Sequence, residues 1–339
     1  MVASPLRAPR PAQTSEIALL DRIAARVATR AGVAVGIGDD AAVLEGDGSW
    51  LVTQDLLVEG VHFRRETTSW RDLGHKALAV NLSDVAAMGG VPVAAVVGLA
   101  LPWRTRPVPD RALEDLYDGM EALAGRHGVT IAGGDVSEGA VLVLAVTAIG
   151  RMEPGRAPVL RSGARPGDVL CVTGALGAAA AGLLTLEDPI VATGLAPEEA
   201  EALVFAQRRP EPRVAAGRVL AGVAHAMLDC SDGLALDALR LARASGVAVE
   251  LDLERVPLAP GVARVAEAAG REPDLLAATG GEDYELIAAL APGRVEAVAA
   301  ALDVPLTPVG RVTAGEPAIR LLRRGRPVAA PRLGWEHGA

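Results

Sequence analysis

Short acidic motifs set among apolar residues constrain this chain more than any other feature. Each motif places a carboxylate beside glycine, serine or a second carboxylate, inside or next to an apolar segment. Asp is almost never buried without a partner, and carboxylates that converge repel one another unless a cation lies between them. A hard cation such as Mg²⁺ prefers these oxygen ligands and commonly links them to substrate phosphates. The motifs are GIGDD at 36–40, TQD at 53–55, NLSD at 81–84, GGD at 133–135 and LDCSDG at 228–233.

The bulk composition narrows the class of protein and its partners. The 339 residues are enough for two domains, and a 50% hydrophobic content allows a sizeable core. The net charge of −9 without a basic tract argues against a nucleic-acid partner. We expect no membrane span and no secretory signal, hence a cytoplasmic protein. Cys171 and Cys230 stand in apolar surroundings and are expected to be buried free thiols.

Helix and strand patterns alternate along the chain, which predicts an α/β or α+β fold. A stretch rich in Pro, Gly and Arg, Arg151–Asp168, divides it, so we expect a flexible terminus over 1–14 and domains over 15–150 and 151–339. Predicted helices are Glu16–Ala31, Leu73–Met88, Arg111–His127, 178–186, Arg213–Ala221 and Leu234–Ala244. Predicted strands are Trp50–Val58, Val93–Leu101, Val129–Ala132, Val141–Ile149, Val169–Thr173, Val247–Leu253 and Leu286–Ala291.

Some common kinds of nucleotide and hydrolase site are excluded. Lys76 is the only lysine in the chain, and no GxxxxGK[ST] loop occurs, so a Walker-type ATP site is ruled out. The HRD and DFG motifs of protein kinases and the GxSxG motif of hydrolases are absent as well. Any nucleotide must therefore be held by backbone amides, arginine and metal.

The first two motifs offer candidate metal ligands. In GIGDD, one of Asp39 and Asp40 would face a metal while the other holds the loop; the alternative is a surface turn. Asp55 lies in an apolar strand, where it is either a metal ligand or a solvated charge at the strand end. Thr53 shares the face of Asp55, and Gln54 points away, because side chains alternate along a strand.

Three further motifs extend this set. Asp84 shares a helix face with a polar residue three positions earlier, on an otherwise apolar helix, and needs a metal or a cationic partner. Asp135 follows two glycines that let a phosphate approach the backbone closely. Ser231 stands between Asp229 and Asp232 before a helix, where it either caps the helix or contacts phosphate with the helix N-terminus.

Two residues suit an organic substrate. His62 in GVHF is either structural or a substrate contact. Trp335, in a chain with only 2% aromatic residues, either packs the C-terminal tail or stacks on a ring.

Taken together, the motifs resemble those of the thiamine-monophosphate kinase family, in the superfamily of aminoimidazole ribonucleotide synthetase. The resemblance spans roughly Glu16 to Trp335 and follows one order along the chain. The matching segments are GIGDDAAVL, DLLVEGVHF, KALAVNLSDVAAMGG, GGD, RSGARPGD, DCSDGL and GGEDYEL.

The resemblance implies transfer of the ATP γ-phosphoryl group to thiamine monophosphate by direct in-line attack with several Mg²⁺ ions. It implies a two-domain architecture with the active site in the cleft between domains, and an N-terminal sheet shared across a homodimer. Gln54 stands where the family leads us to expect Thr or Ser.

The resemblance also implies roles for single residues. Mg²⁺ would be held by Asp40, Thr53, Gln54, Asp55, Asp84, Asp135, Asp229 and Asp232. ATP would contact Gly134, Asp135, Arg161 and Ser231, and the thiamine phosphate would contact His62, Glu282 and Trp335. The alternatives are a related ATP-dependent enzyme that activates an amide or carbonyl oxygen, and a non-catalytic sensor of nucleotide or thiamine phosphate.

Overall fold

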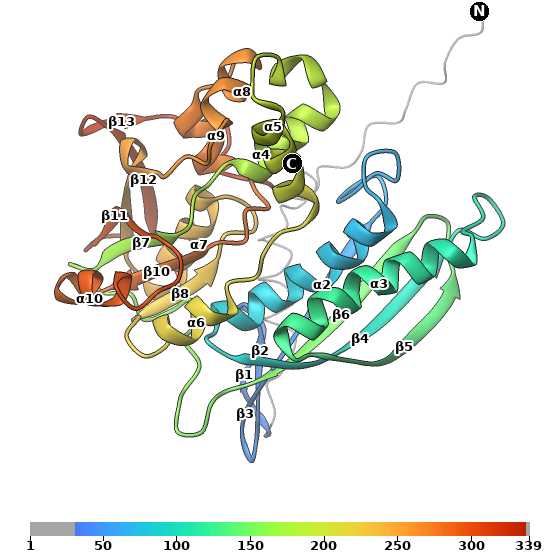
Figure 1. The fold of residues 1–339 in the computed structure, drawn as a ribbon. Coiled ribbons are helices and arrows are strands. Elements are labelled where there is room, and N and C mark those ends of the chain that lie inside the picture. The colour runs from blue at the N-terminus through green and yellow to red at the C-terminus, as the bar shows by residue number, and fades with distance from the viewer. Residues whose placement is uncertain (1–30, 337–339) are drawn as a thin grey trace, which may run out of the picture.

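Two mixed β-sheets, one in each half of the chain, organise the structure (Figure 1). It is a computed structural model that describes residues 31–336. The first sheet has the strand order β1-β2-β3-β6-β4-β5, and the second has the order β13-β12-β9-β11-β7-β10-β8. Most neighbouring strands are antiparallel, with β4–β5 and β9–β12 parallel. The expected mixed α/β class is therefore confirmed. The flexible terminus expected over 1–14 lies outside the described residues, and so does the helix expected over Glu16–Ala31 apart from Ala31, which lies in a turn.

The elements follow the chain in a simple division. The first half contains β1 (Val33–Val35), β2 (Ala42–Gly46), β3 (Gly48–Val58), α2 (Trp70–Ala87), β4 (Val91–Leu101), α3 (Asp110–His127), β5 (Thr130–Glu138) and β6 (Val143–Arg151). The second half contains β7 (Val169–Thr173), α4 (Ala178–Glu187), η1 (Pro189–Ala192), α5 (Pro197–Arg208), α6 (Val214–Leu220), β8 (Ala226–Asp229), α7 (Leu234–Ser245), β9 (Ala248–Asp252), η2 (Leu253–Arg255), α8 (Val262–Ala268), α9 (Pro273–Thr279), β10 (Leu286–Leu290), η3 (Pro292–Arg294), α10 (Val295–Ala299), β11 (Leu306–Thr313), β12 (Ala318–Arg323) and β13 (Arg326–Val328). Residues 152–168 connect the two sheets without a helix or strand.

One predicted strand was wrong in extent. The strand expected at Val129–Ala132 is β5, which continues through the two glycines and Asp135 to Glu138. The extension arises because β5 pairs in parallel with β4 over its whole length, from Thr130 opposite Ala94 to Glu138 opposite Leu101. Asp135 therefore lies within a strand rather than in a turn after one.

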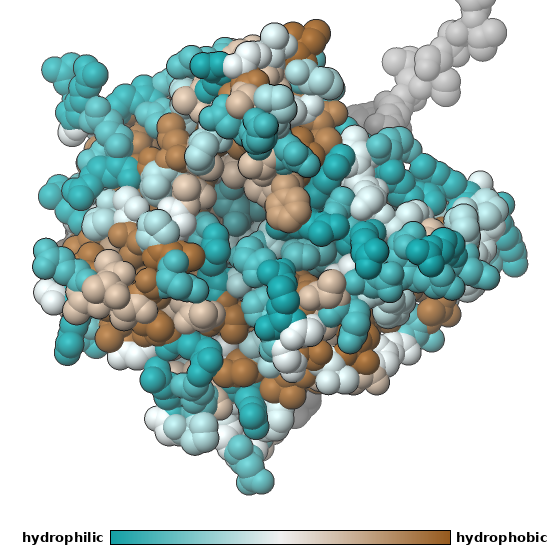
Figure 2. Space-filling view, in the orientation of Figure 1, coloured by the Kyte–Doolittle hydropathy of each residue, from teal (hydrophilic) through white to brown (hydrophobic). Residues whose placement is uncertain are grey.

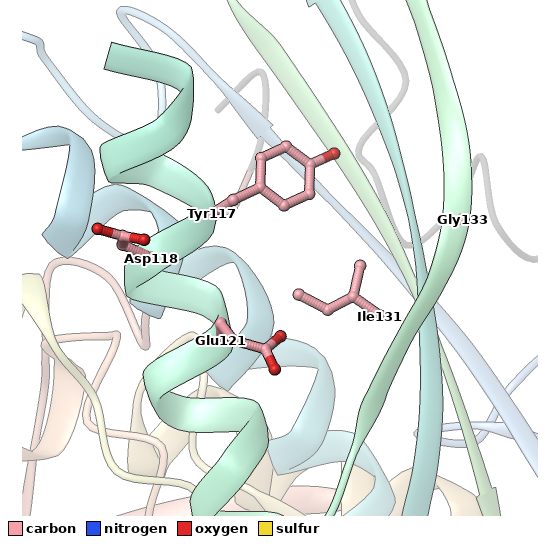
Figure 3. A pocket seen from close by; sticks show the side chains of 5 residues that line it. All are labelled: Tyr117, Asp118, Glu121, Ile131 and Gly133. Atoms are coloured by element: carbon pink, nitrogen blue, oxygen red, sulfur yellow. The ribbon is translucent and has the colours of Figure 1, made fainter. Parts of the chain in front are cut away.

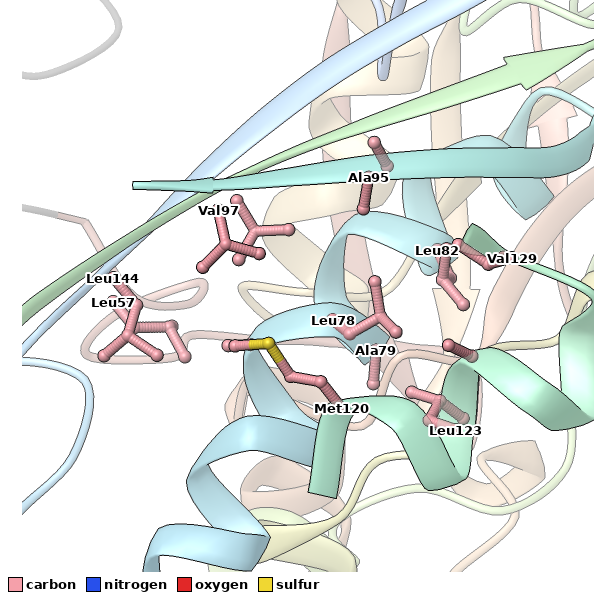
Figure 4. Packing of buried hydrophobic residues seen from close by; sticks show 14 of the residues in the cluster. Leu57, Leu78, Ala79, Leu82, Ala95, Val97, Met120, Leu123, Val129 and Leu144 are labelled. Atoms are coloured by element: carbon pink, nitrogen blue, oxygen red, sulfur yellow. The ribbon is translucent and has the colours of Figure 1, made fainter. Parts of the chain in front are cut away.

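Apolar side chains from α2, α3 and the first sheet form the N-terminal core. Leu78 and Leu82 of α2 and Met120 and Leu123 of α3 belong to one cluster, which Val97 joins from the sheet that the helices cover (Figure 4). The two helices approach closely at Gly74, where a Cβ atom would lie 1.8 Å from the carbonyl oxygen of Leu116. Glycine is therefore required at this helix crossing.

Helix α2 also contacts the second half of the chain. A Cβ atom on Gly217 of α6 would lie 2.1 Å from the carbonyl oxygen of Ala86, so α6 packs directly on the C-terminal turns of α2. At the other end of α2, the His75 imidazole Nε2 lies 2.9 Å from the carbonyl oxygen of Pro210. Helix α2 packs on the first sheet and also on β8 and α6 of the second half. It therefore determines how the two halves of the chain are placed against each other.

The surface over α3 is largely hydrophilic, with a few separate hydrophobic residues (Figure 2). Within the described residues, no helix combines the length and the apolar character that a membrane crossing needs.

Candidate active site

Three carboxylates from distant parts of the chain converge where the two halves meet. Asp40 follows β1, Asp84 lies near the end of α2, and Asp229 ends β8. One oxygen from each lies within 4.8 Å of the others. Carboxylates so close together repel one another, so the arrangement favours a bound cation.

Hydroxyl groups hold two of these carboxylates in place. The Thr53 hydroxyl donates to Asp84 Oδ2 at 2.5 Å, and the Ser83 hydroxyl donates to Asp229 Oδ2 at 2.6 Å. Ser83 was missed in the sequence analysis, although it lies inside the NLSD motif. Its hydrogen bond links α2 of the first half to Asp229 at the end of β8 in the second half.

Burial and like charge both disfavour ionisation of this cluster. Burial, and then the charges of Asp55 and Asp229, raise the pKa of Asp84 well above its usual value. Burial, and then the charge of Asp40, raise the pKa of Asp229 well above its usual value. A cation in the cluster would reverse these shifts, because it stabilises the ionised form.

The donor groups fit a hard divalent cation such as Mg²⁺. Asp40 Oδ1 accepts from Arg161 Nη2 at 2.8 Å, but the buried Asp40 Oδ2 has no hydrogen-bond partner among the described residues. A buried carboxylate oxygen without a donor is costly. All the converging atoms are oxygens, the ligand type that Mg²⁺ prefers.

Asp39 and Arg161 support the loop that carries Asp40. Asp39 accepts from the backbone N–H of Arg161 at 3.0 Å, and its pKa is raised to about 6 by burial and by the neighbouring Asp40. Asp39 thus holds the loop, and Asp40 enters the cluster. The Arg161 Nε–H is buried and has no partner in the described part of the chain.

Two further predicted ligands border the cluster. The backbone N–H of Asp55 donates to Asn81 Oδ1 at 3.0 Å, and burial together with the charge of Asp232 raises the pKa of Asp55 to about 6. Asp232 accepts from Arg240 Nη1 at 2.5 Å, a partner that the sequence analysis did not identify.

Gly134, Asp135 and Gln54 lie apart from the three converging carboxylates. Asp135 is exposed on β5, an edge strand of the first sheet, and Gly134 precedes it. The Gln54 side chain is exposed on β3, on the face opposite to buried Thr53. The structure therefore brings together Asp40, Asp84 and Asp229, and leaves these predicted residues outside the group.

The residues predicted to contact an organic substrate, His62, Glu282 and Trp335, lie in loops. His62 Nδ1 accepts from the backbone N–H of Val58 at 3.0 Å. The backbone N–H of Glu282 donates to the Ser231 carbonyl at 2.7 Å, and that of Trp335 donates to the Asp232 carbonyl at 3.0 Å. Half of Trp335 is exposed. Ser231 does not cap helix α7, whose N-cap is Gly233 without a side-chain hydrogen bond.

A cavity of about 470 Å³ lies elsewhere, between α3 and β5 (Figure 3). Tyr117, Asp118 and Glu121 line it from the helix, and Ile131 and Gly133 line it from the strand. It shares no residue with the carboxylate cluster. Because converging buried carboxylates favour a bound cation, we assign the candidate site to the carboxylates and not to this cavity.

Comparison with known proteins identifies the family. Residues 38–152 match the AIR synthase related protein N-terminal domain, and residues 165–321 match its C-terminal domain. The thiamine-monophosphate kinase of Rhodopirellula baltica is 39% identical over 83% of this chain and 84% of its own length. That of Bacillus subtilis is 38% identical over 88% of this chain and 91% of its own. The chain belongs to the thiamine-monophosphate kinase family.

A solved structure extends this assignment to three dimensions. AaThiL complexed with AMPPCP and TMP matches with a TM-score of 0.83 and 32% identity, covering 97% of this chain and 99% of that one. The resemblance inferred from the motifs is thus confirmed, and so is the two-domain mixed α/β fold of the thiamine-monophosphate kinase family.

Proposed function

We propose that this chain transfers the γ-phosphoryl group of ATP to thiamine monophosphate, which yields thiamine diphosphate and ADP. The observation that carries the proposal is the convergence of Asp40, Asp84 and Asp229 in a chain of the thiamine-monophosphate kinase family. The complex of AaThiL with AMPPCP and TMP supports the pair of substrates.

Asp40, Asp84 and Asp229 form the centre of the proposed Mg²⁺ site, and Asp55 and Asp232 border it. When bound, Mg²⁺ would supply positive charge that neutralises the phosphates and the charge that develops during transfer. Thr53 and Ser83 would keep two carboxylates oriented through their hydroxyl hydrogen bonds. The remaining proposed ligands are Gln54, through its backbone, and Asp135.

The nucleotide and the acceptor are assigned to separate groups of residues. We assign ATP to Gly134, Asp135, Arg161 and Ser231, and thiamine monophosphate to His62, Glu282 and Trp335. Arg161 is suited to a phosphate because its buried Nε–H has no described partner. The acceptor is itself a phosphate, ionised at neutral pH, so the reaction needs no strong general base.

The domain organisation and the assembly belong to the same proposal. Residues 15–150 and 151–339 act as two domains, with the site between them. Leu56 of β3 is 54% exposed and Val96 of β4 is 36% exposed on the face of the first sheet that α2 does not cover. An exposed apolar sheet face suits a second copy of this chain, hence a homodimer. We place the enzyme in the cytoplasm, where ATP and reduced thiols coexist.

A chromatographic assay for thiamine diphosphate tests the proposed activity. Purified protein is incubated with thiamine monophosphate, ATP and Mg²⁺, and parallel samples contain EDTA in place of Mg²⁺. We expect Mg²⁺-dependent thiamine diphosphate with an equal amount of ADP. ADP without thiamine diphosphate would favour a related enzyme with another acceptor. Nucleotide binding without turnover would favour a sensor.

A further inference from the structure

The only lysine of the chain is fully buried at the contact between the two halves. Lys76 lies on α2 with 1% of its side chain exposed. Its Nζ lies 2.6 Å from Glu282 Oε1 and donates to the Gln207 carbonyl at 3.1 Å. A buried ammonium group is costly unless it is paired, so this position needs both partners.

Glu282, the partner of Lys76, has an unusual backbone. Its φ is 69°, in the left-handed region that non-glycine residues rarely adopt, and Tyr284 nearby has φ 51°. Such conformations persist only where the surroundings hold them. Here the Glu282 N–H donates to Ser231, and Gln207 Nε2 donates to Glu282 Oε2 at 3.2 Å. Both carboxylate oxygens are therefore fixed, while 27% of the side chain remains exposed.

Helix α2 connects this ion pair to the carboxylate cluster. Ser83 follows Lys76 by seven residues, which places the two on the same side of the helix and about 10 Å apart along its axis. Ser83 holds Asp229, and Lys76 holds Glu282. Asp229 pairs with Leu286 between β8 and β10, so both acidic residues belong to neighbouring segments of the second half.

We propose that Lys76 is a positioning residue for the phosphate acceptor. It fixes the Glu282 carboxylate beside Lys76, which lies roughly 10 Å along α2 from Ser83. There the carboxylate receives the cationic or N–H-bearing ring portion of an acceptor whose phosphate lies at the cluster. Lys76 does not touch the acceptor. The inference rests on the proposed function, and it adds the residue that sets the acceptor end of the site.

Replacing the ammonium group should release Glu282. Lys76→Met keeps a chain of similar length and removes the charge, so the Glu282 carboxylate loses its ion pair and its fixed orientation, while the Glu282 N–H keeps its hydrogen bond to the Ser231 carbonyl. We expect KM for thiamine monophosphate to rise about tenfold or more, the usual scale for a lost hydrogen bond to a charged group. KM for ATP should stay within about twofold, because Lys76 contacts no proposed nucleotide residue.

Asp72→Asn is the matched control. Asp72 lies on α2, as Lys76 does, and pairs with Arg209, which lies two residues after the Gln207 that Lys76 contacts. Asp72 belongs neither to the proposed ATP contacts nor to the proposed acceptor contacts. We expect its two KM values to match those of the wild type. A Lys76→Met enzyme with unchanged acceptor KM, or with equal rises for both substrates, would overturn the role of Lys76, as would the same acceptor effect in Asp72→Asn. Lack of turnover by the wild type would instead overturn the proposed function.

A second measurement does not depend on the folding of Lys76→Met. Because Lys76 is the only lysine, lysine labelled with ¹³C at Cε gives a single side-chain resonance in the wild-type protein. We expect thiamine monophosphate to shift this resonance, and Glu282→Gln to shift it and abolish the response to the acceptor. A resonance that does not respond to thiamine monophosphate in an active enzyme would contradict the proposal.

Discussion

Neutralising one carboxylate of the cluster should stabilise the metal-free protein while removing its function. In Asp84→Asn, the amide oxygen still accepts from Thr53, but the negative charge is gone. Two unit charges 4.8 Å apart repel by about 3.5 kcal/mol at an effective dielectric constant of ~20. Burial and like charge raise the pKa of Asp84, so part of this repulsion is already relieved by protonation. We therefore expect a gain of about 1–3 kcal/mol, or a rise in Tm of roughly 2–6 °C.

Thermal unfolding in EDTA and in excess Mg²⁺ measures the stability of the protein without and with the cation, and steady-state kinetics measure kcat. The wild type should gain stability from Mg²⁺, because an ion that binds only the folded state shifts the equilibrium toward it. Asp84→Asn should gain little, and its kcat should fall about 100-fold or more. The control Asp118→Asn changes an exposed pair with Arg71 and should move stability by at most about 0.5 kcal/mol. A lower Tm of Asp84→Asn in EDTA, or an undiminished response to Mg²⁺, would refute the idea of a repulsive cation site.

Three further predictions concern the sheet face, the tail and a buried carboxyl group. Leu56→Asp places a charge on the exposed apolar face, so light scattering should show monomer where the wild type is a dimer; an unchanged mass would remove this face from the interface. Trp335→Ala should raise KM for thiamine monophosphate more than KM for ATP, and equal changes in steady-state kinetics would argue against a contact with the thiamine ring. Burial raises the pKa of Asp283 to about 7, above the unfolded value near 3.8, so its contribution to stability is present at low pH and is lost as pH rises through about 7. Denaturant unfolding should show the wild type losing stability relative to Asp283→Asn between about pH 4 and 7, and parallel curves would contradict this.

Local sequence patterns predicted the long elements well. β3, α2, β4 and α3 occur where apolar periodicity placed them, with ends that differ by a few residues. Shorter elements such as β8 and α8 were not predicted. A segment of four residues, such as Ala226–Asp229, is apolar without a distinguishable period, and becomes a strand because β10 pairs with it.

The candidate site was also predicted only in part from the sequence. The motifs indicated acidic residues that need partners, and the family followed from their order along the chain. The residues alone left open which of Asp39 and Asp40 faces a metal, because both stand in one motif, and only the family resemblance favoured Asp40. In the structure Asp39 holds the loop and Asp40 enters the cluster. The pairing of Asp232 with Arg240 depends on how the turn after β8 enters α7.

The sequence by itself determined the chemistry: oxygen ligands at apolar positions, one lysine and no phosphate-binding lysine loop. Only the tertiary structure decided which of these groups meet. Asp40, Asp84 and Asp229 come within 4.8 Å because α2 packs against both halves of the chain. The same packing buries Lys76 against Glu282. Local periodicity reports which face of an element is buried, whereas contacts between residues far apart in the chain depend on how whole elements pack.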